Sequence, residues 1–326
     1  MSDTSPTPRT YRVEEAVADD LSAWVLHDDG SDLHAIWVPE AGMLGASLVH
    51  QGQELLWQGA GVRAYAERCA FMGIPFLHPW ANRLDHFGYA AGGHEVVLDP
   101  ASPLLLLEEN GLPIHGLLNA SRRWSVLESA AGADGARLVA GLEFDDAELL
   151  AAFPFPHRVN MDVRLGGGAL EVAISLTPTA DQPVPVSFGF HPYLSLPGAP
   201  RSEWEVAFPI RRRVLLDDRN LPTGETVAAT PITGSIGART WDDCFDRLEQ
   251  PARFSVSGGG RTVVLEFAQG YPVAQVFAPP GKEFLCLEPM TAPVNSLVSA
   301  AGALVWVPPG QRHTASFRIV PAGPDR

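Results

Sequence analysis

The 326-residue sequence predicts an all-β protein, a single large antiparallel β-sandwich. Apolar and polar residues alternate with a period of two, and this alternation is found on both sides of glycine-rich turns. The 31 glycines and 29 prolines are spread along the chain, as expected between many short strands. No linker or composition shift marks a boundary. We therefore expect one domain over residues 1–326, with polar tails at about residues 1–10 and 321–326.

The first distinctive element along the chain is one short helix within Asp145–Pro154. Acidic residues at its start can cap the helix, and the proline at its end stops it. No segment longer than a turn or two elsewhere shows convincing helical periodicity.

The clearest strands form a predicted hairpin over residues 157–178. Apolar and polar residues alternate on both sides of a turn of three glycines, Gly166–Gly168, which indicates one buried face. The alternating apolar positions are Val159, Met161, Val163, Leu165, Leu170, Val172, Ile174 and Leu176. The same period-two pattern occurs over residues 253–267, again across three glycines, and over residues 303–320.

Charge, cysteines and hydropathy exclude several classes of protein. The 23 basic and 38 acidic residues give a net charge of -15, which argues against a nucleic-acid partner. The three cysteines, Cys69, Cys244 and Cys286, form no CxxC pair, so neither a disulfide framework nor a thiolate zinc site is indicated. No signal-peptide pattern or apolar run of ~20 residues is present. We expect a cytoplasmic protein without a membrane partner. The sequence does not determine the oligomeric state.

The chemistry-bearing residues lie in four segments: residues 73–84, 110–118, 187–196 and 284–297. Phosphate-loop, dinucleotide-binding, zinc-protease and serine-hydrolase motifs are all absent from the sequence. In two of the four segments an apolar run is followed by a titratable residue and a proline, as in Phe190-His191-Pro192 and Leu287-Glu288-Pro289. Because proline ends a strand, this pattern predicts that both side chains stand at strand ends and face one pocket. The alternative is a structural histidine and an exposed acid.

The other two segments carry groups suited to hydroxyl recognition. Asn82-Arg83 offers an amide and a planar guanidinium, and His115 precedes a glycine at which a ligand can approach the backbone. Taken singly, each has a structural alternative: an arginine that satisfies loop carbonyls, and a turn histidine.

Together these residues resemble the aldose 1-epimerases, or galactose mutarotases. The resemblance rests on Asn82-Arg83, Ile114-His115-Gly116, Phe190-His191-Pro192-Tyr193 and Leu287-Glu288-Pro289, in that order. Residues 221–225 (LPTGE), 241–245 (WDDCF) and 274–277 (AQVF) agree with it, so it extends from about residue 73 to residue 307. It implies a supersandwich fold and an isomerase that interconverts the anomers of an aldose without a cofactor or metal.

The resemblance also implies roles for individual residues. His191 corresponds to the general acid and Glu288 to the general base. The implied sugar-binding residues are Asn82, Arg83, His115, Tyr193, Asp242 and Gln275, with Asp243 as the rival of Asp242. Mutarotation needs one proton accepted from the C1 hydroxyl and one donated to the ring oxygen, and a carboxylate with a histidine supplies both.

Departures from the family pattern indicate a divergent branch. Pro289-Met290-Thr291 follows the base, one histidine rather than two precedes Gly116, and His78 occupies an unexpected position, where we favour a structural role. Four alternatives stay open at this point. The first is a hexose-6-phosphate 1-epimerase, with Arg83, Arg123, Arg158 and Arg211 as candidate phosphate ligands. The second is a non-catalytic carbohydrate-binding protein, and the third is a glycosidase that uses Asp242 with Glu288. The fourth is a metal site formed by His115, His191 and Glu288.

Overall fold

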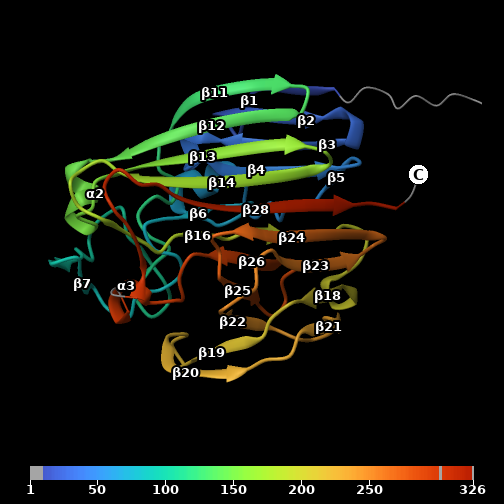
Figure 1. Ribbon diagram of the computed structural model, residues 1–326. Helices are drawn as coiled ribbons and strands as arrows, with labels where there is room; N and C mark the ends of the chain where they lie inside the picture. Colours follow the sequence, from blue (N-terminus) through green and yellow to red (C-terminus); the bar gives the residue numbers. More distant parts are fainter. Residues whose placement is uncertain (1–9, 301–302, 325–326) are drawn as a thin grey trace, which may run out of the picture.

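Antiparallel sheets make up most of the structure, a computed structural model that describes residues 10–300 and 303–324 (Figure 1). The largest sheet has nine strands, in the order β11 (Ser125–Gly132), β12 (Gly135–Phe144), β13 (His157–Gly166), β14 (Ala169–Pro178), β28 (His313–Ala322), β24 (Arg261–Gln269), β23 (Ala252–Gly258), β18 (Glu205–Phe208) and β21 (Ile232–Ser235). In Figure 1 these strands follow one another from the top of the molecule downward.

A second sheet of eight strands lies against the first. Its order is β20 (Pro222–Ala228), β19 (Arg212–Leu216), β22 (Trp241–Phe245), β25 (Val273–Ala278), β26 (Leu285–Met290), β16 (Gly189–Phe190) and β6 (Phe76–Leu77), and β17 (Tyr193–Leu194) also pairs with β26. A third sheet has the order β1 (Tyr11–Ala18), β2 (Leu21–Asp28), β3 (Leu33–Val38), β4 (Leu44–His50) and β5 (Gln53–Glu54).

Short elements complete the described chain. Three strand pairs are β7 (Gly88–Ala91) with β8 (His94–Val97), β9 (Leu106–Leu107) with β10 (Pro113–Ile114), and β15 (Val184–Val186) with β27 (Val305–Val307). The α-helices are α1 (Val62–Arg68), α2 (Ala147–Ala152) and α3 (Ser296–Ser299), and the 3₁₀ turns are η1 (Asp29–Ser31), η2 (Pro39–Ala41) and η3 (Arg201–Glu203). Within the described residues, no helix is long and apolar enough to cross a membrane.

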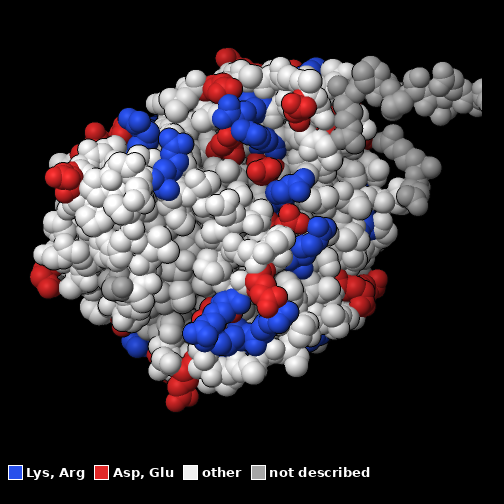
Figure 2. All heavy atoms as spheres, viewed as in Figure 1, with Lys and Arg blue, Asp and Glu red and all other residues white. Residues whose placement is uncertain are grey.

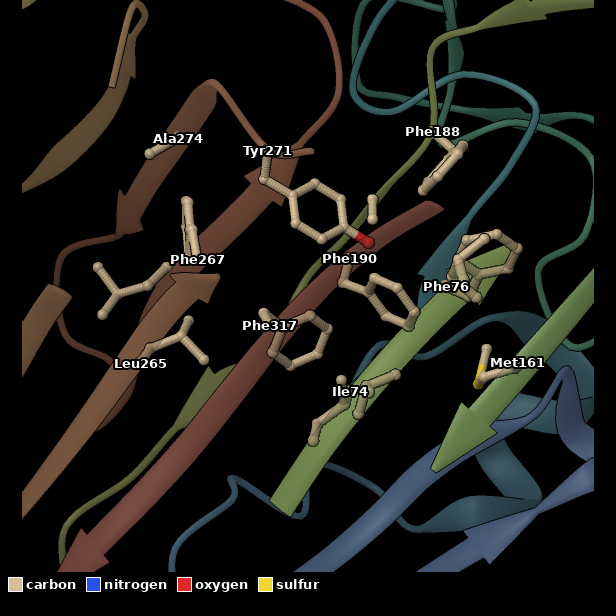
Figure 3. Close-up of a cluster of buried hydrophobic side chains, with 14 of the residues drawn as sticks. Ile74, Phe76, Met161, Phe188, Phe190, Leu265, Phe267, Tyr271, Ala274 and Phe317 are labelled. Carbon is tan, nitrogen blue, oxygen red and sulfur yellow. The ribbon is translucent and has the colours of Figure 1, made fainter. Parts of the chain in front are cut away.

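Alternation along the strands builds the core between the two large sheets. Side chains of β13 alternate between buried and outward positions, as the sequence predicts. Phe190 from the eight-stranded sheet meets Phe317 from the nine-stranded sheet with ring centroids 5.0 Å apart (Figure 3). Each such fully buried side chain contributes about 1.5–3 kcal/mol. The predicted antiparallel β-sandwich is thus confirmed.

The outward face of the nine-stranded sheet carries mixed charge rather than an apolar surface. Arg137 donates to Asp162 and Glu128 across neighbouring strands, and Arg253 donates to Glu266. Figure 2 shows basic and acidic side chains mixed in one band across this face. Exposed ion pairs of this kind contribute ~0–1 kcal/mol each, so their main effect is to keep this face polar.

The remaining expectations on local structure have mixed outcomes. The helix expected within Asp145–Pro154 is α2, and Asp146 caps it by accepting from the backbone N–H of Glu148. The C-terminal tail begins later than predicted, because β28 continues to Ala322. Residues 1–9 and 325–326, which hold most of the predicted tails, lie outside the described residues. A single domain over residues 1–326 stays a prediction.

Candidate functional site

A cavity of about 160 Å³ lies on the eight-stranded sheet, at the point where β26 passes β16 and β17. It brings together seven of the eight predicted site residues from segments far apart in the sequence. Its lining is Asn82, Arg83, Ile114, His115, His191, Tyr193, Asp242, Phe277 and Glu288. Gln275, the eighth, lies outside this lining.

Strand register brings His191 and Glu288 together. Gly189 of β16 pairs with Met290, and Tyr193 of β17 pairs with Cys286, so the same register places His191 opposite Glu288. The Nε2 atom of His191 lies 3.2 Å from Oε1 of Glu288. Backbone bonds from His191 N to Pro75 O and from Tyr193 N to Gly73 O fix the turn on its other side.

The structure corrects one detail of the sequence interpretation. Glu288 does not stand at a strand end, because β26 continues through Pro289 to Met290. The register of Gly189 with Met290 sets Pro289 opposite Phe190, the last residue of β16, so the N–H that proline lacks falls where the ladder between β26 and β16 ends. His191 itself does lie between two strands, as predicted.

Burial controls the protonation of this pair. Removal from water lowers the pKa of His191 to about 3, far below the ~6.5 of an exposed histidine. Burial also raises the pKa of Glu288 well above its usual value, and the charge of Asp242 adds to this while Arg83 opposes it. Both shifts favour the neutral forms, a neutral imidazole on His191 and a protonated carboxyl group on Glu288.

Asn82, Arg83 and His115 come from two segments that are bonded to each other. The backbone N–H of His115 donates to Asn82 O at 2.9 Å, and Arg83 forms an isolated bridge with Ile114. Asn82 and His115 both have left-handed backbone, with φ of 57° and 63°. The residue after His115 must be glycine, because a Cβ on Gly116 would lie 2.2 Å from the carbonyl oxygen of His78.

Asp242 joins two of the predicted binding residues, Arg83 and Gln275, into one network. Its Oδ1 accepts from Nε2 of Gln275 at 2.5 Å, and its Oδ2 lies 3.5 Å from Nη2 of Arg83. Gln275 is therefore placed behind Asp242 rather than in the cavity wall. Asp242 lines the cavity while Asp243 pairs with Arg213, so Asp242 stays the aspartate that we expect to face a sugar.

Aromatic rings form one wall of the site. The ring of Tyr193 stacks on His191 with centroids 4.5 Å apart and an interplanar angle of 12°. Phe71 and Phe277 approach His191 at 6.1 and 5.9 Å. Neither phenylalanine was predicted as a site residue, since an aromatic residue in a β-rich chain is typically part of the core.

Several buried polar atoms at the site have no hydrogen-bond partner within the described residues. They are Nδ1 of His115, Nδ1 of His191 and Oε2 of Glu288. Buried polar groups in proteins are nearly always paired, so these atoms are free to bond to a polar ligand in the cavity. The described residues contain no group of three or more histidine, cysteine or acidic side chains arranged to hold a metal.

His78 lies away from the cavity, as the structural interpretation expects. It is 1% exposed, and its Nε2 lies 2.8 Å from Nε2 of His157. His157 donates through Nδ1 to the carbonyl oxygen of Phe155 at 2.6 Å. Since that nitrogen carries the proton, Nε2 of His157 is the acceptor for His78. The sequence gives no signal for this pairing, because 79 positions separate the two histidines.

Comparison with known proteins gives a consistent result. The family model "Aldose 1-epimerase" matches residues 39–320. The Slr1438 protein of Synechocystis sp. PCC 6803 has 25% sequence identity and a TM-score of 0.74, over 99% of this chain and 100% of that one. A galactose mutarotase-like protein of Clostridium acetobutylicum has 19% identity and a TM-score of 0.83, over 96% and 99%.

A third solved structure has a similar fold at lower identity. Galactose 1-epimerase of Lactobacillus acidophilus NCFM has 13% identity and a TM-score of 0.77, over 97% of this chain and 100% of that one. A search of curated protein sequences found no significant match.

Proposed function

The chain belongs to the aldose 1-epimerase family, and from this premise we propose that it interconverts the α and β anomers of an unphosphorylated aldose. The observation that carries the proposal is the buried contact between His191 and Glu288, 3.2 Å apart at a cavity with unpaired polar atoms. Family membership supports an isomerase. The substrate and the residue roles are our proposal.

The reaction requires one proton acceptor and one proton donor. We propose that the bound sugar displaces the direct contact between His191 and Glu288 and that the carboxyl proton passes to His191. Hydroxyl groups together with Arg83 then stabilise the ionised carboxylate. Glu288 accepts the proton of the C1 hydroxyl while His191 donates to the ring oxygen, the C1–O5 bond breaks, and the open aldehyde rotates about C1–C2. Reversal of both transfers closes the other anomer. Each positioned transfer contributes about 10²–10⁴-fold.

The remaining polar residues orient the sugar. Asn82, Arg83, His115 and Asp242 offer donors and acceptors of different kinds, while Tyr193 and Phe277 offer apolar faces. Gln275 acts in this proposal through its bond to Asp242 rather than on the sugar itself.

Charge favours a neutral sugar over a hexose 6-phosphate. Among the described residues that line the cavity, Arg83 is the single cation, and it faces the carboxylates of Asp242 and Glu108. The other candidate phosphate ligands are engaged elsewhere: Arg123 with Asp146 and Glu148, Arg158 with Glu143, and Arg211 with Glu249. A phosphate dianion would thus meet carboxylates without a free basic partner.

A non-catalytic sugar-binding protein is less well supported by the site. Binding of a neutral sugar does not require two titratable groups in buried contact, and burying them costs free energy that a neutral amide would avoid. We further propose that the protein acts in the cytoplasm on small sugars.

Polarimetry of freshly dissolved α-D-glucose and α-D-galactose in metal-free buffer tests the proposal. We expect the wild-type protein to accelerate the approach to anomeric equilibrium for at least one free sugar, and to act more slowly on glucose 6-phosphate at equal concentration. Faster reaction with the phosphate would refute the neutral substrate class. No acceleration with any hexose, pentose or hexose phosphate, while sugar binding persists in calorimetry, would instead indicate a binding protein.

A further inference from the structure

The turn that joins β19 to β20 lies over Asp242. Arg213 of β19 pairs with Phe245 of β22 and Val214 pairs with Cys244, so the same register carries the end of β19, Leu216, to the position of Asp242. The connection that follows, residues 217–221, leads directly into the LPTGE motif.

This turn is built to present the side chain of Asn220. Asp217 accepts from the backbone N–H groups of Arg219 and Leu221 at 2.9 Å, and the backbone N–H of Asn220 donates to Asp217 O at 3.0 Å. Asn220 has left-handed backbone with φ of 59°, a conformation that asparagine adopts more readily than most residues. Its Nδ2 then donates to Oδ2 of Asp242 at 3.0 Å.

We propose that Asn220 is a positioning residue for the reaction: from this turn it holds the Asp242 carboxylate in the orientation in which that carboxylate accepts a sugar hydroxyl. Gln275 fixes the Oδ1 atom at 2.5 Å, but Arg83 lies 3.5 Å from Oδ2, at the limit of a hydrogen bond. Without Asn220, Oδ2 has no short donor among the described residues, and the carboxylate can rotate about its side-chain bonds. The inference rests on the proposed function, because it assigns Asp242 to the bound sugar.

Two substitutions separate this role from a structural one. Asn220→Gly removes the amide and keeps the left-handed turn, since glycine adopts positive φ without strain. Asn220→Asp keeps the size of the side chain but sets a second carboxylate against Asp242. Arg219→Ala is the matched control, because its exposed side chain contacts Asp217 within the same turn and not Asp242.

Steady-state polarimetry on the preferred free sugar measures KM and kcat for each variant. Asn220→Gly should raise KM roughly 10-fold and leave kcat within about twofold, because a hydrogen bond to a charged group is lost from binding. Asn220→Asp should lower kcat/KM further. The thermal midpoint of Asn220→Gly should stay within about 2 °C of wild type, and Arg219→Ala should match wild type in both parameters.

A double-mutant cycle with Asp242→Asn decides the mechanism. If Asn220 acts through Asp242, the double variant Asn220→Gly/Asp242→Asn should equal Asp242→Asn alone. Multiplicative losses, or a fall in kcat at constant KM together with a lower midpoint, would overturn the inference. An inactive wild-type protein would refute the proposed function first, and the inference with it; an active wild type with an unchanged Asn220→Gly variant refutes the inference alone.

Discussion

Acidification from pH 7.5 to 5.5 should destabilise this protein strongly, because four histidines are buried in their neutral form. Burial lowers the pKa of His157 to about 4 and that of His191 to about 3, and it holds the pKa of His78 and His115 well below the ordinary value. In the unfolded chain these side chains titrate near 6.5. The unfolded state therefore binds more protons as the pH falls, and the free energy of unfolding decreases with it.

The size of the loss in unfolding free energy follows from the same pKa shifts. At pH 5.5 each such histidine lowers the free energy of unfolding by ~1.4 kcal/mol relative to pH 7.5, or ~5 kcal/mol for four. Glu288 acts in the opposite direction, since its raised pKa lets the folded state keep a proton that the unfolded chain loses above about pH 4.5. Because Glu288 offsets part of this loss, the expected net loss lies below ~5 kcal/mol, set against the ~5–15 kcal/mol that stabilises a typical protein.

Urea titration at the two pH values, followed by tryptophan fluorescence, measures this loss. A matched variant is His157→Gln, whose side-chain oxygen can still accept from His78 but whose amide does not titrate. Its unfolding free energy should fall by ~1.4 kcal/mol less than that of wild type between the two pH values. Equal stability of the wild-type protein at pH 7.5 and pH 5.5 would refute the reasoning, because it would mean that the buried histidines bind protons in the folded state.

Three further changes test single contacts. Gly116→Ala places a Cβ 2.2 Å from the carbonyl oxygen of His78 at a φ of +74°, so urea titration should show a loss of ~3 kcal/mol or more, and an unchanged midpoint would contradict the close approach. Arg83→Lys keeps the charge but not the planar donors that face Asp242, so kcat/KM in polarimetry should fall roughly 10–100-fold; full activity would show that charge alone suffices. Burial favours the neutral form of the Glu288 carboxyl, and Glu288→Gln replaces that form by a neutral amide, so its melting temperature should stay within about 3 °C of wild type; a much larger drop would mean that the carboxyl is ionised in the folded protein.

The fold class was predictable because alternation records which side chains face the core. The hairpin of β13 and β14 follows from Val159–Leu165 and Leu170–Leu176 with glycines between them. Alternation does not record which distant strands become neighbours. The insertion of β28 between β14 and β24, and the continuation of β26 through Pro289, depend on pairing across the molecule and could not be predicted.

The candidate site was predictable where short motifs carry the family resemblance. His191 and Glu288 belong to such motifs, and the register of β26 with β16 and β17 explains why they meet. Asn220 belongs to no motif quoted for the family, and its contact with Asp242 exists only because β19 pairs with β22. The low pKa of His191 was also missed, since it results from burial that the local sequence does not show.

The central claim is that His191 and Glu288 carry out the two proton transfers. The most direct measurement is the initial polarimetric rate with freshly dissolved α-D-galactose and α-D-glucose for wild type, Glu288→Gln and His191→Asn, in metal-free buffer at neutral pH. We predict acceleration by the wild-type protein and a loss of about 10²–10⁴-fold in each folded variant. Variants that retain a tenth or more of the wild-type rate would contradict the assignment of proton transfer to this pair.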